Sequence, residues 1–130
     1  MTGKEYQKLA MRTNDGGCFD RLADALDNNT FETELECKQS PNIADLLNGI
    51  MGLCGESGEV VDIVKKTVFH KHPIDIDELK KELGDVMWYV AMCCNALNIS
   101  LDDVMQGNIE KLKKRYPDGF STDASINRAE

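Results

Sequence analysis

Long hydrophobic runs are absent from this sequence. No apolar stretch reaches the roughly 18 residues of a transmembrane helix, and the start, MTGKEYQKLAMRT, lacks the apolar stretch and cleavage site of a signal peptide. Positive charge is scarce as well, since 15 Lys and Arg stand against 23 Asp and Glu and the net charge is −8. This balance disfavours nucleic-acid polymers and anionic membranes as partners. We expect a cytoplasmic protein.

Cysteine pairs with metal-binding or redox spacing are also missing. The five cysteines are an odd number without a CxxC pair, so neither a disulfide framework nor a structural zinc site is predicted. The histidines, His70 and His72, both fall in a predicted turn, which argues against the Glu-x-x-His pattern of ferritin-like di-iron centres. Metal binding, if present, therefore has to use carboxylates.

Alternation at period two is absent over any useful length, whereas apolar residues recur at helical spacing through most of the chain. The sequence predicts an all-α fold, and 130 residues fit a single domain, 1–130. We expect a first helix over about 3–13 and a short one over 19–26, inside a segment, 14–40, that otherwise reads as a loop or insert. The next helix is predicted to have Ser40 as its cap and Pro41 in its first turn.

Two long helices are predicted in the middle of the chain, one over 43–69 and one that Asp75 or Asp77 caps. A break at 70–73 separates them, so we expect an antiparallel hairpin. Apolar residues at steps of four and three are expected to face each other across it. These are Ile43, Leu47, Ile50, Cys54, Val61, Val64 and Val68 on the first helix, and Leu79, Leu83, Val86, Val90, Cys93 and Leu97 on the second.

A last helix is predicted from Ser100, its N-cap, to about Arg115, where Pro117 and Gly119 follow. The segment 121–130 reads as a loose tail. The core of the domain is therefore expected within about 43–120.

Two pairs of acidic residues lie three apart on the two long helices: Glu56 with Glu59, and Glu82 with Asp85. A hairpin folded about position 70.5, the mean of their positions, would bring the pairs level. Four converging carboxylates repel unless a cation compensates them, and all-oxygen ligands favour Mg²⁺, or Mn²⁺ as a substitute. The alternative is that these acids form solvated faces with the neighbouring lysines Lys65, Lys66, Lys80 and Lys81.

Other residues have both a functional and a structural interpretation. Asn108, Lys111 and Arg115 share a face of the last helix and suit phosphate oxygens, or they complement the helix dipole. Trp88 can stack on a base or pack in a core. Glycines within the first long helix, each costing ~1 kcal/mol relative to Ala, indicate close helix approach or space for a ligand. They are Gly49, Gly52, Gly55 and Gly58.

Three stretches together, GLCGESGEVVDIVKK, ELKKELGDVMWYV and NIEKLKKRYPDGF, resemble the MazG-like nucleoside triphosphate pyrophosphohydrolases of the all-α NTP pyrophosphatase superfamily. That family has an ExxE helix, a spacer, an ExxD helix and an Asn-x-x-Lys-Leu-x-x-Arg segment. The chain departs from the fuller pattern at Gly55, where a further acid is common, and 14–40 matches nothing recognisable. The matching residues are Glu56, Glu59, Glu82, Asp85, Asn108, Lys111, Leu112 and Arg115.

The resemblance implies Mg²⁺-dependent hydrolysis of nucleoside triphosphates, deoxy or noncanonical, to the monophosphate and pyrophosphate. It implies that the four acids hold the metal, and that Glu59 or Glu56 is the catalytic base. Substrate binding then falls to Asn108, Lys111, Arg115 and Trp88. It also implies a bundle completed by oligomerisation, as a homodimer or a homotetramer. Two other interpretations stay open: a catalytically silent nucleotide-sensing module, and a helical interaction module.

Overall fold

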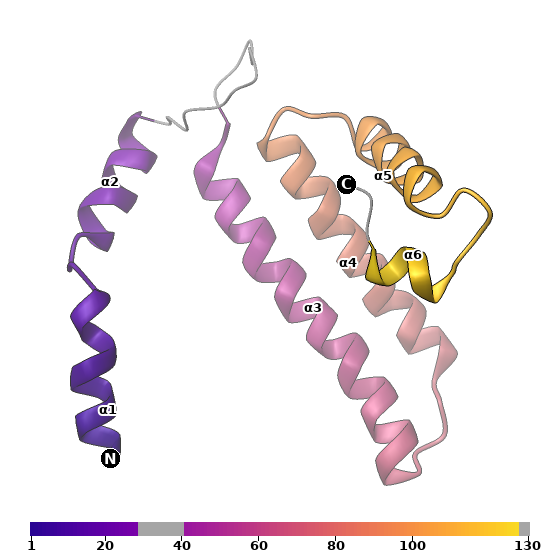
Figure 1. The fold of residues 1–130 in the computed structure, drawn as a ribbon, viewed down its shortest axis with the longest axis horizontal. Helices are drawn as coiled ribbons and strands as arrows, with labels where there is room; N and C mark the ends of the chain where they lie inside the picture. Colours follow the sequence, from indigo (N-terminus) through magenta and orange to yellow (C-terminus); the bar gives the residue numbers. More distant parts are fainter. Residues whose placement is uncertain (29–40, 128–130) are drawn as a thin grey trace.

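The computed structural model describes residues 1–28 and 41–127. The described part is helical and contains no strand, which confirms the all-α prediction. A long hairpin, α3 and α4, is flanked by an N-terminal pair of short helices and by the C-terminal helices α5 and α6 (Figure 1). The helices are α1 (Gly3–Ala10), α2 (Cys18–Asn28), α3 (Ile43–His70), α4 (Ile76–Ala96), α5 (Leu101–Arg115) and α6 (Thr122–Ile126), with a 3-10 turn at Met11–Thr13.

The N-terminal helices begin where local capping chemistry favours them. Thr2 and Glu5 form a capping box at the start of α1, in which each side chain accepts a hydrogen bond from the other residue's backbone N–H. Before α2, Asp15 accepts a bidentate hydrogen bond from Arg21. Helix α2 confirms the short helix predicted over 19–26 and extends it at both ends, whereas 29–40 lie outside the described residues.

The hairpin is bounded by caps at both helices. Asn42 caps α3 by accepting a hydrogen bond from the Asp45 N–H, so Pro41 precedes the helix and the expected cap, Ser40, lies outside the described residues. At the other end Lys71 adopts a left-handed conformation with φ 58°, which stops α3. Asp75 then caps α4 through the Glu78 N–H.

Small residues let α3 and α4 approach closely. A Cβ placed on Gly49 would lie 2.7 Å from the Cys93 sulfur, and one placed on Gly52 would overlap the Tyr89 ring. Gly52 and Tyr89 average to position 70.5, the predicted centre of the hairpin. Two of the glycines flagged in the sequence are therefore explained by helix contact, while Gly55 and Gly58 have open space around them.

The apolar stripe predicted for α3 does not face α4, and that prediction was wrong. Of its members only Ile43 is buried; Val61 is 63% exposed and Val68 61% exposed. The contact with α4 is made instead by a face that includes Gly49, Gly52 and Glu56. The helical spacing of apolar residues does not show which of two neighbouring apolar faces of one helix contacts its partner. We call the exposed set the α3 apolar face: Leu47, Ile50, Cys54, Val61, Val64 and Val68.

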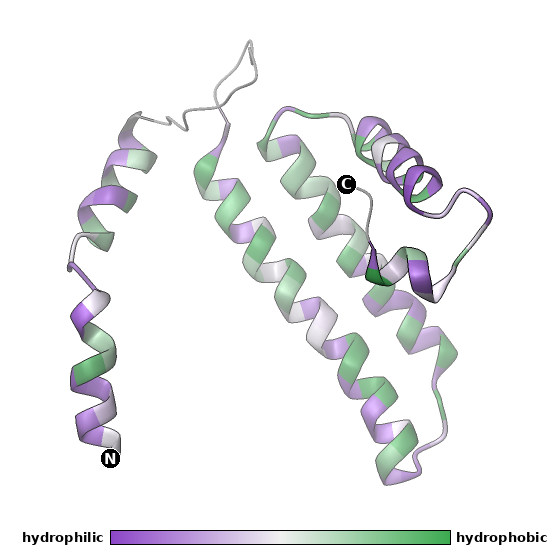
Figure 2. Cartoon of the chain, viewed as in Figure 1, coloured by the Kyte–Doolittle hydropathy of each residue, from purple (hydrophilic) through white to green (hydrophobic). Residues whose placement is uncertain are grey.

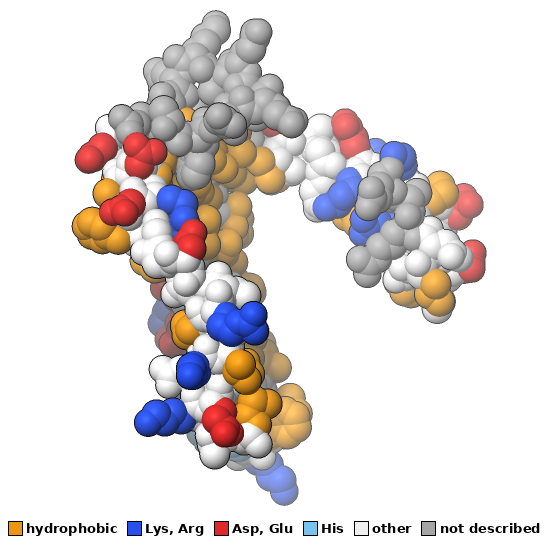
Figure 3. Space-filling view, turned by 60° about the vertical axis from the view of Figure 1, so that its left-hand side comes forward, with side chains coloured by type: hydrophobic (Ala, Val, Ile, Leu, Met, Phe, Trp, Pro, Cys, Tyr) orange, Lys and Arg blue, Asp and Glu red, His pale blue; other side chains and the backbone are white. Residues whose placement is uncertain are grey.

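The C-terminal helices stand clear of the hairpin (Figures 1 and 3). Ser100 caps α5 as predicted, and α5 ends at Arg115. The tail expected to be loose contains α6, which Ser121 caps by accepting a hydrogen bond from the Ala124 N–H. None of the helices in the described residues is long and apolar enough to cross a membrane.

We predict opposite effects of alanine at two glycines of the hairpin. Gly84→Ala, in open space on α4, should stabilise the fold by about 0.5–1 kcal/mol through helix propensity. Gly52→Ala should destabilise it by about 1–3 kcal/mol, because the added methyl displaces Tyr89. Denaturant unfolding compares the two. Equal stabilisation by both substitutions would contradict the close contact of α3 with α4.

Candidate metal centre

The hairpin brings acids from α3 and α4 together. One oxygen each of Glu56, Glu82 and Asp85 can be chosen so that all lie within 4.8 Å of one another. Glu56 and Asp85 average to position 70.5, the same register that pairs Gly52 with Tyr89. The closest part of the helix contact therefore lies one turn from the carboxylates. Two of the three side chains, Glu56 and Glu82, are half-buried.

The spacing suits a hard divalent cation. Mg²⁺ binds oxygen at about 2.1 Å, so opposite ligands of one ion lie about 4.2 Å apart. At most one pair among three ligands of an octahedral ion is opposite, and adjacent ligand oxygens lie about 3 Å apart, so oxygens as much as 4.8 Å apart have to close by up to about 2 Å around such an ion. An all-carboxylate donor set without His or Cys favours Mg²⁺ or Mn²⁺ over zinc. The residues present fit a divalent metal.

Mutual repulsion is visible in the acidity of Glu82. Its pKa is raised above the ordinary 4.5, first because burial disfavours the charged form, then because of the charge of Glu56, with Glu78 and Asp85 adding to it. Ionised together, these groups are a strained arrangement that a cation relieves. The three carboxylates could therefore hold a cation.

The lysines that could neutralise the cluster are engaged elsewhere. Asp62 accepts Lys65 and Lys66, both at 2.6 Å, and these two partners lower its pKa to about 2. The other pair behaves in the same way: Lys80 binds Asp77 at 3.1 Å and Lys81 binds Glu78 at 2.7 Å. Within residues 1–28 and 41–127, no ion pair reaches Glu56, Glu82 or Asp85. This argues against the solvated-face alternative.

Glu59, the fourth predicted acid, lies outside the cluster. It is exposed, one turn further along α3, and its charge acts on Lys66, whose pKa it helps to raise after the larger effect of Asp62. The structure thus assembles three of the four predicted ligands.

The predicted substrate residues are in place on their helices but not at the cluster. Asn108 and Lys111 are exposed on α5, and this helix does not pack closely on α3 or α4 (Figure 1). Arg115 is half-buried, and its Nε is buried without a hydrogen-bond acceptor among the described residues. Trp88 is 59% exposed on α4 and meets the Tyr89 ring edge-on, with centroids 4.9 Å apart.

Tyr89 packs inside the hairpin, close to the cluster. It lies one turn after Asp85, packs over Gly52 and orients Trp88. Its ring follows Asp85 by four residues and lies opposite a glycine in the predicted register, which is the position of a core residue.

Comparison with known proteins decides the family. The model of the MazG nucleotide pyrophosphohydrolase domain matches residues 45–120, more than half of the chain and all of the hairpin from its first turn. This chain belongs to the MazG family. A relative named "Gene 37 protein", from Mycobacterium phage L5, is 43% identical over 82 residues, which are 60% of this chain and 72% of that protein. Among solved structures none matches the chain.

Membership of the MazG family agrees with the position of the cluster. Glu56, Glu82 and Asp85 all lie within the matched residues, as do Glu59 and the α5 residues. The N-terminal helices α1 and α2 lie outside the match. The family therefore accounts for the hairpin and α5, and leaves the N-terminal helices unassigned.

The raised pKa of Glu82 predicts how metal and pH act on stability. Folding raises this pKa, so metal-free protein loses stability as the pH rises from below 4.5 through the raised value. Saturating Mg²⁺ should remove that loss, because it stabilises the ionised carboxylates.

Thermal melting of wild type and Glu82→Gln, with Mg²⁺ and with chelator, isolates this contribution, since other titrating groups are shared. We expect stabilisation by Mg²⁺ at neutral pH in wild type and little of it in the variant. If the melting temperature of wild type is the same with Mg²⁺ as with chelator at every pH, the cluster is ruled out as a metal site.

Proposed function

We propose that this MazG-family chain is a Mg²⁺-dependent nucleoside triphosphate pyrophosphohydrolase. Its substrates would be deoxynucleotides or noncanonical nucleotides, cleaved to the monophosphate and pyrophosphate. The observation that carries the proposal is the cluster of Glu56, Glu82 and Asp85, three carboxylates that form no ion pair among the described residues and lie at the centre of the family's matched region. Cytoplasmic location belongs to the same proposal.

In this proposal Glu56, Glu82 and Asp85 hold the metal, with Mn²⁺ as a substitute. The bound ion would supply charge neutralisation and polarisation of the phosphate oxygens. The protein's remaining task is to position water for attack on the α-phosphorus, so that the bond from this phosphorus to the bridging oxygen breaks and pyrophosphate leaves.

The attacking water has to lose a proton to a carboxylate near the cluster. Glu59 and Glu56 are the two candidates. Glu59 is better suited, because it lies one turn away from the cluster, is exposed, and is not committed to the other carboxylates. Glu59 can also complete the set of metal ligands, as the sequence predicts. Measuring Mg²⁺ affinity without the Glu59 carboxylate separates the two roles, because loss of a ligand weakens metal binding and loss of a base does not.

The basic face of α5 would bind the phosphate oxygens. Lys111 is exposed, and the buried Nε of Arg115 lacks an acceptor among the described residues, so this donor has capacity for a phosphate oxygen. Asn108 shares the same face and would assist in positioning. Trp88, exposed on α4 three residues after Asp85, would stack on the base.

Because α5 stands clear of the hairpin in one chain, its residues would approach a cluster only after assembly or movement. We therefore include a homo-oligomer, a dimer or a tetramer, in the proposal. The exposed apolar residues of α3 support this.

The reaction is tested by incubating the purified protein with a panel of canonical and modified NTPs and dNTPs, with Mg²⁺, Mn²⁺ or chelator. We expect monophosphate and pyrophosphate in equal amounts, dependent on metal. Release of inorganic phosphate together with the nucleoside diphosphate would contradict attack at the α-phosphorus. Tight metal-dependent binding without any product would instead support the nucleotide-sensing alternative.

Glu59→Gln should lower kcat by about 10²-fold or more, since a positioned base contributes at least this factor. Helicity should be unchanged, because Glu59 is exposed and makes no contact in the helix interface. Mg²⁺ affinity, measured by calorimetric titration, should fall less than it does in Glu82→Gln. Full turnover in Glu59→Gln would exclude the residue from the site.

A further inference from the structure

Two adjacent lysines of α3 are held by a single carboxylate. Lys65 Nζ lies 2.6 Å from Asp62 Oδ1, and Lys66 Nζ lies 2.6 Å from Asp62 Oδ2. Hydrogen bonds from these lysines lower the pKa of Asp62 to about 2, so its carboxylate is ionised at neutral pH. Both oxygens of Asp62 are therefore engaged, and both ammonium groups are held at one point on the helix.

Lys66 has a second acid, Glu59, on its own side of α3. The two residues are seven apart, which turns them only about 20° from each other and separates them by about 10.5 Å along the helix axis. Helical side chains lean toward the N-terminus, so the flexible stem of Lys66 leans toward Glu59. The hydrogen bond to Asp62 is the main cause that raises the pKa of Lys66, and the charge of Glu59 adds to the rise. Asp62 therefore holds a cation that Glu59 also attracts.

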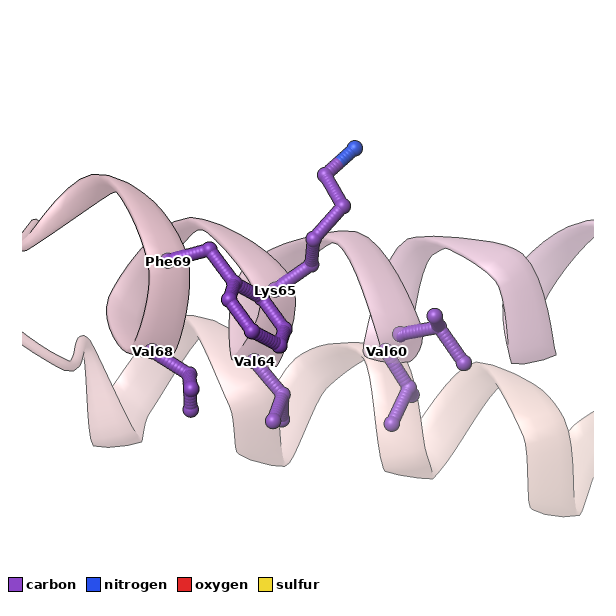
Figure 4. A pocket seen from close by; sticks show the side chains of 6 residues that line it. Val60, Val64, Lys65, Val68 and Phe69 are labelled. Carbon is purple, nitrogen blue, oxygen red and sulfur yellow. The ribbon is translucent and has the colours of Figure 1, made fainter.

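Lys65 offers a comparison within the same helix, because it shares the partner of Lys66 but not its direction. Lys65 follows Glu59 by six residues and is turned about 120° away from it. Figure 4 shows its side chain extending away from Val64 and Val68, with which it lines an open apolar groove. The two lysines are otherwise matched, since their side chains are 51% and 50% exposed. Release of both lysines would give Glu59 one new neighbour, Lys66.

A purely structural role for these ion pairs makes a different prediction. Charged residues form hydrophilic bands between apolar ones in the C-terminal half of α3 (Figure 2). Exposed ion pairs three or four residues apart stabilise such a helix weakly, and either lysine contributes in the same way. If stability were the whole role of Asp62, the two lysines would be interchangeable. If Asp62 protects Glu59, only Lys66 matters.

We propose that Asp62 is a positioning residue, which keeps the Glu59 carboxylate available to the metal site by holding Lys66. The inference rests on the proposed function, in which Glu59 acts as the base or as a further metal ligand. Asp62 itself touches neither the metal nor the substrate. When its charge is removed, the released ammonium group of Lys66 pairs with Glu59 and competes there with the proton of the attacking water or with the cation.

Turnover in a set of matched variants tests this role. Asp62→Asn should lower kcat by about two- to five-fold, the range that an exposed ion pair to Glu59 supports, and should leave KM nearly unchanged. Adding Lys66→Met should restore kcat, whereas adding Lys65→Met should not. Asp62→Glu, which keeps both ion pairs, should retain the wild-type kcat. A deficit that both lysine substitutions repair, or that neither repairs, would overturn the proposal.

A structure of the variant without metal gives a readout that does not depend on turnover. In crystals of Asp62→Asn grown with chelator, Lys66 Nζ should lie within about 4 Å of a Glu59 oxygen. A Lys66 side chain that extends into solvent, or that pairs with another acid, would overturn the proposal.

The wild-type control separates this role from the reaction itself. A wild type that releases no pyrophosphate would overturn the proposed function together with the role of Asp62. An active wild type whose Asp62→Asn variant has the same kcat would overturn the role of Asp62 alone. The Asp62 side chain is 32% exposed and pairs within α3, so we expect the variant to fold, which circular dichroism checks.

Discussion

The close contact between α3 and α4 is the constraint on which the rest of the structure depends. Gly49 and Gly52 remove two side chains, and Cys93 and Tyr89 fill the space. This fixes the register of the hairpin about position 70.5 and places Glu56 beside Glu82 and Asp85. A larger residue at either glycine would separate the helices where the carboxylates have to converge. The same glycines cost helix propensity, which the contact compensates.

Charge follows from that register. Near the cluster, Asp62, Asp77 and Glu78 form ion pairs with the lysines, so none of these ion pairs is made by Glu56, Glu82 or Asp85. Burial and mutual repulsion then raise the pKa of Glu82. Such an arrangement costs stability in the metal-free protein and gains it when a cation binds. Stability of the metal-free fold therefore does not explain the cluster of Glu56, Glu82 and Asp85.

Several elements were predictable from the sequence for physical reasons. Caps at Asp75 and Ser100, the hairpin and its centre all follow from local chemistry and from the spacing of the two acidic pairs. The direction of the α3 apolar face was not predictable, because that helix has two adjacent apolar sectors and period does not say which one meets α4.

The site was predictable in part for similar reasons. Three acids converge as the spacing indicates, whereas the rotamer of Glu59 and its distance from the cluster depend on side-chain geometry that spacing does not specify. The position of α5 relative to the hairpin depends on tertiary packing. The sequence pattern therefore does not predict whether the basic face of α5 approaches the acids. Helix α2 was predictable over 19–26, and only its ends, at Cys18 and Asn28, differ from the prediction.

The most direct test of the central claim is a crystal structure of the protein grown with Mn²⁺, with anomalous diffraction used to locate the ion. We expect one or more Mn²⁺ ions coordinated by Glu56, Glu82 and Asp85 between α3 and α4. Anomalous density elsewhere on the molecule, with these carboxylates separated and solvated, would contradict it.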